Sequence, residues 1–239
     1  MNGIIDRGNT KTKIFAFNKD VLIKRHSFFN EEEQYIIQTI KSFSFDRGII
    51  SSSANISDTL QMATHYFVKM SHEIKLPIKI NYKTPETLGT DRIALAVGAN
   101  TLYPNKNCLI ISAGTCITID LIDQNNTYQG GIISPGLTIR LQSLHTFTDK
   151  LPLLNLKKEG SFPIIGKTTK ESMESGIYNG AFAEINATID NFRLNFEDLT
   201  VLLTGGDMKM FELNTKNKIF AEQNLQAIGL NRILNYNAE

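Results

Sequence analysis

The amino-acid sequence predicts an α/β protein made of two similar halves, each with a mixed sheet flanked by helices. Three observations predict this class. The N-terminal segment alternates short apolar runs with polar turns, which is typical of a meander of strands. Helical and strand-like segments then alternate along the chain, as they do in α/β domains. From residue 107 onward the chain repeats the order of strand, glycine turn, strand, polar turn and strand.

In the first half, strands are expected at 4–6, 11–17 and 21–29, because β-branched and aromatic residues lie on both sides of a polar turn. Residues 30–43 carry acids at their start and apolar residues at helical spacing, which predicts a helix. A buried strand is expected at 47–53, a further strand at 76–82 and a helix over 87–99. Residues 56–70 repeat the alternation of strand and helix seen before them.

In the second half, residues 107–134 predict three strands joined by a glycine turn and a polar turn. A helix is expected over 135–147 with Pro135 at its first position, where a missing N–H group costs nothing. A long helix over 170–196 precedes a buried strand over 199–207 that ends in a glycine pair.

Length and charge limit the function classes. The 239 residues suffice for one large or two small domains. The chain has 25 basic and 24 acidic residues, without the basic excess of a nucleic-acid binder, so small-molecule partners are favoured. No apolar run approaches the ~18 residues that cross a bilayer, and no apolar signal core opens the chain. We therefore expect a cytoplasmic protein without nucleic-acid or membrane partners.

The cysteines and histidines offer no metal site. Cys108 and Cys116 lie in apolar strand-like sequence, and two cysteines cannot build a disulfide framework or a zinc site, so buried free thiols are expected. The histidines lack the spacing of metal ligands, and we expect structural or surface roles for all of them, namely His26, His65, His72 and His145.

The first strand ends in Asp6 and runs through Arg7 into the turn Gly8, Asn9 and Thr10. A simple turn explains this pattern, because Asp, Gly and Asn are ordinary turn residues. A phosphate site also explains it, since the segment presents backbone N–H groups, a hydroxyl and a carboxylate suited to a metal ion. The segment alone leaves both interpretations open.

Five short motifs together resemble the type III pantothenate kinase family, within the superfamily of acetate and sugar kinases, chaperone ATPases and actin. The motifs follow the family's order and spacing over nearly the whole chain: DRGNT at 6–10, LGTDR at 88–92, SAGTCITID at 112–120, GGIISPG at 130–136 and LTGGD at 203–207.

The resemblance implies two actin-like (ribonuclease H-like) domains, at 1–100 and 101–239, with an ATP cleft between them. It implies ATP-dependent phosphorylation of the primary hydroxyl of pantothenate, the first step of coenzyme A biosynthesis. It also implies Mg²⁺, a monovalent cation (K⁺ or NH₄⁺) and a homodimer. The alternatives are a kinase of another small alcohol on the same fold and a non-catalytic ATP-binding or regulatory relative.

The resemblance implies a role for each motif. Asp91 matches the catalytic base. The substrate-binding positions are Tyr82, Gly89, Thr90, Asp91, Arg92 and Thr169. The ATP-binding positions are Asp6, which also matches the Mg²⁺ ligand, together with Gly8, Asn9, Thr10, Lys13, Gly114, Thr115, Gly205 and Gly206.

Ordinary structural roles remain open at several of these positions. In the helix over 87–99, Leu88, Ile93, Leu95 and Val97 are expected to be buried, while Asp91 and Arg92 point elsewhere, as an exposed charge pair would. Tyr82 suits a strand and Thr169 suits a helix N-cap. Both glycine pairs, 130–131 and 205–206, suit tight turns without a ligand, and contact with ATP is favoured only for the second pair.

Two residues depart from the family pattern. Arg7 stands where the family has an apolar residue, and Ser112 stands where the family has an aspartate that ligates the monovalent cation. A serine hydroxyl is a weak ligand for a cation. We therefore hypothesise that no monovalent cation is needed and that Arg7 supplies part of the missing charge. Strand alternation argues against the second part, because Arg7 should face away if Asp6 faces the cleft.

Overall fold

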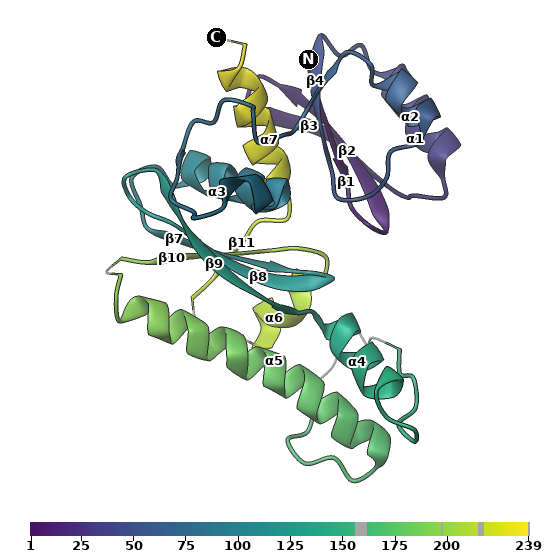
Figure 1. The fold of residues 1–239 in the computed structure, drawn as a ribbon, viewed down its shortest axis with the longest axis vertical. Helices are drawn as coiled ribbons and strands as arrows, with labels where there is room; N and C mark the ends of the chain where they lie inside the picture. Colours follow the sequence, from purple (N-terminus) through teal and green to yellow (C-terminus); the bar gives the residue numbers. More distant parts are fainter. Residues whose placement is uncertain (156–161, 197, 215–217, 239) are drawn as a thin grey trace. The chain divides into compact units, whose positions relative to one another are not determined.

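The computed structural model describes residues 1–155, 162–196, 198–214 and 218–238. Within these ranges helices flank two sheets, and each sheet contains both parallel and antiparallel strand pairs (Figure 1). The predicted α/β class with two mixed sheets is therefore confirmed. No helix in these ranges combines the length and the apolar character that crossing a membrane requires.

The contacts divide the chain into two compact units. The first comprises Met1–Pro104, Asn126–Tyr128 and Asn224–Glu239, and the second comprises Asn105–Asn125 and Gln129–Gln223. The C-terminal segment thus belongs to the same unit as the N-terminus. The extents of two actin-like domains expected from the sequence, 1–100 and 101–239, stay a prediction.

The first unit begins with a five-stranded sheet. Its strands are β1 (Asn2–Arg7), β2 (Lys11–Asn18), β3 (Val21–Phe29), β4 (Arg47–Ser52) and β5 (Phe67–Lys69), and its helices include α1 (Glu33–Ser42) and α2 (Asp58–Ala63). The strand order is β3-β2-β1-β4-β5. The first three strands form the predicted antiparallel meander, and β4 and β5 continue the sheet in parallel with β1.

The middle strand β1 is buried along its whole length, so both of its faces are covered. Helix α1 contributes its buried residues Ile36 and Ile40 to the core that contains Ile5. A Cβ atom on Gly3 would lie 2.8 Å from the ring of Phe45, so the glycine lets that ring pack directly on the strand. Packing on both faces therefore holds the strand that ends in Asp6.

Helices α3 (Thr90–Leu102) and α7 (Leu225–Tyr236) contact each other at backbone distance. A Cβ atom on Gly229 would lie 1.8 Å from the carbonyl oxygen of Ala94. A Cβ atom on Gly98 would lie 2.2 Å from the carbonyl oxygen of Leu225. Because helix backbone cannot move aside as a flexible side chain can, the two glycines set how closely the helices approach.

Helix α7 is also attached to the sheet of the first unit. The side-chain amide of Asn2 in β1 donates hydrogen bonds to Asn231 and Asn235 of α7, at 2.8 Å each. Asn231 in turn donates to the carbonyl of Lys19 at 2.9 Å. These bonds satisfy buried polar groups, since Asn2 and Asn231 are 5% and 2% exposed.

The second sheet has the order β11-β10-β7-β8-β9-β6. Its strands are β6 (Lys79–Ile80), β7 (Cys108–Ala113), β8 (Cys116–Ile122), β9 (Thr127–Pro135), β10 (Thr200–Thr204) and β11 (Phe220–Ala221). The helices of the second unit are α4 (Leu137–Thr146), α5 (Thr169–Arg193) and α6 (Met208–Asn214). The buried face of α5, including Ile177 and Phe182, joins a core with Ile111 of β7 and Leu203 of β10.

Several sequence predictions differ from the structure. The strand expected at 76–82 is only the two-residue β6. Pro135 ends β9, and Gly136 is the N-cap of α4. Elements α6, β11 and α7 were not predicted, because their apolar residues form short patterns near the C-terminus. A short 3-10 helix, Pro85–Thr87, precedes α3.

The expectation of two buried thiols is correct for Cys108 and wrong for Cys116. Burial raises the pKa of the Cys108 thiol to about 12. Cys116 is exposed, because it is the first residue of β8 and follows a turn. Both cysteines are free thiols, as predicted.

Gly229→Ala should lower the free energy of unfolding by about 3 kcal/mol, because a methyl group would collide with the backbone of α3. Urea denaturation measures this change. Gly180→Ala in α5 is the matched control: apart from the backbone of its own helix, no described atom lies within 4 Å of its added Cβ, and alanine favours a helix, so stability should rise by up to about 1 kcal/mol. Equal stability of Gly229→Ala and wild type would show that the glycine contact is unimportant.

Candidate active site

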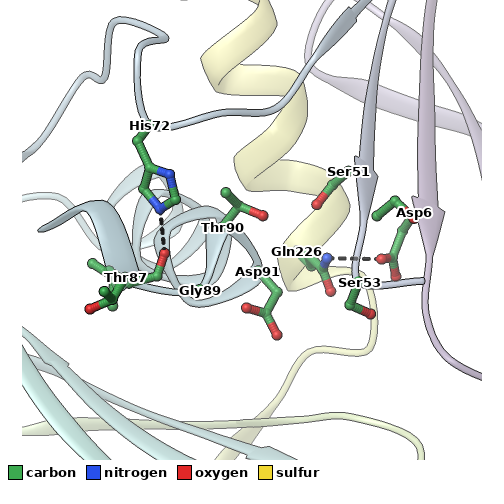
Figure 2. A pocket seen from close by; sticks show the side chains of 11 residues that line it. Asp6, Ser51, Ser53, His72, Thr87, Gly89, Thr90, Asp91 and Gln226 are labelled. Carbon is green, nitrogen blue, oxygen red and sulfur yellow. Dashed lines mark hydrogen bonds between the residues drawn. The ribbon is translucent and has the colours of Figure 1, made fainter. Parts of the chain in front are cut away.

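A cavity of about 280 Å³ lies in the first unit. Four predicted site residues line it, namely Asp6, Gly89, Thr90 and Asp91. Figure 2 shows Gln226 of α7 reaching Asp6, and Asp91 at the start of α3. The cavity also has lining residues that the sequence did not single out for it: Ser51, Ser52, Ser53, His72, Thr87, Leu88 and Gln226.

The carboxylate of Asp6 is held through both of its oxygens. Oδ2 accepts a hydrogen bond from Nζ of Lys13 at 3.0 Å, and Oδ1 accepts one from Nε2 of Gln226 at 2.9 Å. Asp6 is only 9% exposed. Since each carboxylate oxygen has two lone pairs, the group is oriented but can still accept water or a cation. Gln226 gave no sequence signal, because 220 positions separate it from Asp6.

The adjacent Arg7 points away from Asp6, as strand alternation predicts. Its Nε donates to the carbonyl of Asn55 at 2.9 Å, and its Nη1 donates to the hydroxyl of Thr12 at 3.1 Å. The guanidinium is buried, and Arg7 is not among the described residues that line the cavity. The objection from strand alternation therefore holds, and Arg7 does not place its charge in this cavity.

Asp91 lies in the first turn of α3, where the helix dipole favours a negative charge. Its Oδ1 accepts a hydrogen bond from the backbone N–H of Arg92 at 2.9 Å. A Cβ atom on the preceding Gly89 would lie 2.5 Å from this same oxygen. Glycine at this N-cap position therefore leaves room for the Asp91 carboxylate to fold back over the start of the helix. The Asp91 side chain remains exposed.

The sequence correctly predicted the burial of Leu88, Ile93, Leu95 and Val97, but the expectation of an exposed Arg92 is wrong. Arg92 is 5% exposed, because α3 is enclosed on all sides from Arg92 to Ala99. Its guanidinium lies 6.0 Å from the ring centroid of Tyr128. The ring of Tyr82 lies 6.1 Å from that of Tyr128, so the two predicted substrate residues contact the same aromatic ring.

His72 also has a place at the cavity, although the sequence suggested only a structural or surface group. Its ring Nε2 lies 2.7 Å from the carbonyl oxygen of Leu88, just before Gly89 (Figure 2). This contact ties the loop after β5 to the start of α3. The sequence carried no signal for it, because the histidine lies in a loop and matches no motif.

In the second unit, the two predicted glycine turns lie at the same edge of the sheet. β7 and β10 are parallel, with Thr204 paired to Ser112, so the turns that follow them are neighbours. Gly205 has φ +102, and a Cβ atom there would lie 2.1 Å from the carbonyl oxygen of Ala113. By contrast, no atom lies within 4 Å of a Cβ added to Gly114. The residues Gly114, Thr115, Gly205 and Gly206 are thus grouped by the sheet.

The suggestion that Gly130 and Gly131 form a tight turn is wrong, because both lie within β9. A Cβ atom on Gly131 would lie 2.2 Å from the carbonyl oxygen of Ile119 in β8.

The N-cap of α5 is Thr168, whose hydroxyl accepts from the N–H of Glu171 at 3.1 Å. Thr169 is therefore the first helical residue and not the cap. Both threonines line a separate cavity of about 550 Å³ in the second unit.

No group of three or more metal-binding side chains occurs among the residues that the structure describes. The carboxylate of Asp6 is bonded to the nitrogens of Lys13 and Gln226, and the oxygen-bearing side chains of Ser51, Ser53 and Asp91 line the same cavity. Carboxylate and hydroxyl oxygens suit a hard cation such as Mg²⁺, which keeps several water ligands and needs few protein ligands. The donor set therefore fits Mg²⁺ bound through Asp6 and water.

Comparisons with known proteins agree in sequence and in fold. The type III pantothenate kinase family model matches residues 4–191. A type III pantothenate kinase of Phocaeicola vulgatus is 39% identical over 241 residues, covering 99% of both chains. One from Cytophaga hutchinsonii is 42% identical and covers 99% of this chain and 100% of the other.

Two solved structures share the fold at low identity. One, described as a Baf family transcriptional activator from Campylobacter jejuni, has a TM-score of 0.66 and 19% identity, covering 99% of this chain and 98% of the other. The activator of a 2-hydroxyisocaproyl-CoA dehydratase from Clostridium difficile, with bound ADPNP, has a TM-score of 0.58 and 11% identity, covering 98% and 94%. Because the family model matches residues 4–191 and named type III pantothenate kinases are 39% and 42% identical over almost the full length, the chain belongs to the type III pantothenate kinase family.

Proposed function

We propose that this chain transfers a phosphoryl group from ATP to the primary hydroxyl of pantothenate, the first step of coenzyme A biosynthesis. The observation that carries the proposal is the cavity that both Asp6 and Asp91 line, in a chain of the type III pantothenate kinase family. Phosphoryl transfer depends mainly on positioning and charge neutralisation. Two carboxylates held in one cavity suit this chemistry, one towards the metal and one towards the attacking hydroxyl.

Asp91 is the proposed base. One of its oxygens, Oδ1, is held by the N–H of Arg92, and its side chain is exposed at the cavity. The other oxygen accepts the proton of the substrate hydroxyl and aims the hydroxyl oxygen at the phosphorus. The contact of His72 with the carbonyl of Leu88 restrains the backbone from which Asp91 projects, and Gly89 leaves room for the Asp91 carboxylate.

Asp6 is the proposed anchor for Mg²⁺. Lys13 and Gln226 orient its carboxylate before any ligand binds. Mg²⁺ bound with ATP would neutralise charge on the phosphate oxygens. The ammonium group of Lys13, bonded to Asp6, would add a positive charge beside the metal ion. Because Lys13 is partly exposed, a phosphate group can also reach it.

The remaining site residues stay predictions from the family resemblance. Gly8, Asn9 and Thr10 follow Asp6 after a single residue, Arg7. The neighbouring turns at Gly114 and Gly205 are proposed to allow close backbone approach to a nucleotide. Tyr82, Thr90, Arg92 and Thr169 are proposed to contact pantothenate. The homodimer is likewise proposed from the resemblance, and the cytoplasmic location stays an expectation from the sequence.

The direct test is formation of phosphopantothenate by the purified protein with ATP, Mg²⁺ and pantothenate, detected by mass spectrometry. Other small primary alcohols serve as competing acceptors. We expect pantothenate to be the preferred acceptor. ATP binding without transfer to any acceptor would favour the non-catalytic alternative, and preference for another alcohol would favour the second enzyme alternative.

Asp91→Asn should lower kcat by about 10²-fold or more, because an amide cannot accept the hydroxyl proton. The KM values for ATP and pantothenate should change little. Glu86→Gln is the matched control: it makes the same chemical change five positions earlier, at an exposed residue that does not line the cavity. A kcat of Asp91→Asn within a few-fold of wild type would exclude Asp91 as the base.

Asp6→Asn should raise the Mg²⁺ concentration for half-maximal activity about tenfold, because the metal loses its carboxylate anchor. Titration of activity with MgCl₂ at fixed ATP measures this shift. Asp58→Asn, at an exposed position in α2, should leave the curve unchanged. An unchanged Mg²⁺ dependence in Asp6→Asn would show that the DRGNT segment is only a turn.

We propose that the enzyme needs no monovalent cation, because Ser112 offers a hydroxyl where the family has a carboxylate. Activity in sodium-only or Tris buffer should therefore equal activity with added KCl or NH₄Cl. Activation of about tenfold by either salt would contradict this proposal. Full activity of Arg7→Ile without added ion would rule out a contribution of the Arg7 charge.

A further inference from the structure

A continuous set of hydrogen bonds lies behind the turn at Gly8, Asn9 and Thr10. Nη1 of Arg7 donates to Oγ1 of Thr12 at 3.1 Å, and Oγ1 of Thr12 donates to Oδ1 of Asn30 at 2.8 Å. Nδ2 of Asn30 then donates to the carbonyl oxygens of Gly8 and Asn9, at 2.9 and 3.0 Å. We call Arg7, Thr12 and Asn30 the rear network.

The rear network is attached to the fold at several points. Nε of Arg7 donates to the carbonyl of Asn55, in the segment that follows β4, at 2.9 Å. The backbone N–H of Asn30 donates to the carbonyl of Thr10 at 3.1 Å. Asn30, directly after β3, therefore contacts all three residues of the turn. The turn is connected through side chains to β2, β3 and the end of β4.

Burial makes this network costly to break. Thr12 is 0% exposed and Arg7 is 7% exposed. A buried donor or acceptor without a partner keeps its full desolvation cost, so each hydroxyl or amide in the network holds its neighbours in one geometry. The hydroxyl of Thr12 is the central member, because it accepts from Arg7 and donates to Asn30.

The charge of Arg7 also acts away from the cavity. The pKa of Glu33 is lowered by hydrogen bonds from Thr59 and Ser57, and to a smaller extent by the positive charge of Arg7. Asp6, by contrast, is bound by Lys13 and Gln226 on the other side of the strand. The consecutive residues Asp6 and Arg7 of β1 therefore lie on opposite faces of the sheet. The carboxylate of Asp6 lies at the cavity, and the guanidinium of Arg7 lies behind the strand.

We propose that Arg7 is a positioning residue that holds the turn at 8–10 in its ATP-binding geometry through Thr12 and Asn30. This inference rests on the proposed function, in which the turn contacts the phosphates of ATP. It gives the departure at position 7 a role that requires no contact between the guanidinium and the nucleotide. The family's apolar residue at this position could make no such hydrogen bonds.

The test compares Thr12→Val with Thr12→Ser. Valine keeps the branched shape of threonine but removes the hydroxyl that joins Arg7 to Asn30, whereas serine keeps the hydroxyl. Binding of a non-hydrolysable ATP analogue with Mg²⁺ is measured by calorimetry, together with KM for ATP and for pantothenate. Thr12→Val should raise the Kd of the analogue and the KM for ATP about fivefold, while Thr12→Ser stays near wild type.

Thr64→Val controls for a general loss of stability. Thr64 lies in the same unit, is 6% exposed, and its hydroxyl donates to the carbonyl of Leu60 at 2.8 Å, away from the turn. It should lose stability in urea denaturation with unchanged nucleotide binding. Asn30→Ala is the second variant of the network: it removes the donors to Gly8 and Asn9 together with the acceptor of the Thr12 hydroxyl, and it should match Thr12→Val.

Wild-type affinity for the analogue in either Thr12→Val or Asn30→Ala would overturn the inference, whatever their stability. The KM for pantothenate should stay within about twofold in both variants, since its expected contacts lie elsewhere. The proposed function fails separately, if the wild type binds the analogue but does not phosphorylate pantothenate. In that case the binding measurements still decide whether the rear network positions the turn, and Arg7→Ile, measured in the same way, should match Thr12→Val. A wild-type protein that binds no ATP analogue would overturn both.

Discussion

The close approach of α3 and α7 is the constraint on which the candidate site depends. Gly98 and Gly229 let the two helix backbones touch, and a Cβ atom at either position would force the backbones to shift apart. Helix α3 carries Asp91 at its start, and α7 carries Gln226 at its start. Because Gln226 binds Asp6, the packing of α7 also determines how the carboxylate at the end of β1 is oriented.

The end of β1 shows how one strand can serve two tasks. Alternation sends Asp6 to the cavity and Arg7 to the interior behind it. The carboxylate is held by long side chains from β2 and α7, so it is oriented at the cavity that it lines. The guanidinium is enclosed and bonded to neutral acceptors, so it stabilises the turn that follows. A change at position 7 therefore affects the site through geometry rather than through contact.

The sequence was sufficient for the class of fold and for most of the first sheet, because their signals are local. The meander over β1, β2 and β3, the helix α1 and the buried apolar positions of α3 all follow from the spacing of apolar residues. The elements near the C-terminus were missed. Helix α7 has apolar and small residues on most sides because it is enclosed between other elements, so it lacks the one-sided pattern that marks a surface helix.

By itself, the sequence determined the family and the motif residues, since motifs are short runs whose chemistry and order can be read directly. Asp6, Gly89 and Asp91 were all found in this way, and the structure brings them to one cavity. Only the tertiary structure decided that Arg92 is buried, which groups the Arg7 guanidinium binds, and that His72 and Gln226 belong to the site. Burial and long-range hydrogen bonds depend on which distant segments pack together, and the spacing of residues along the chain does not contain that information.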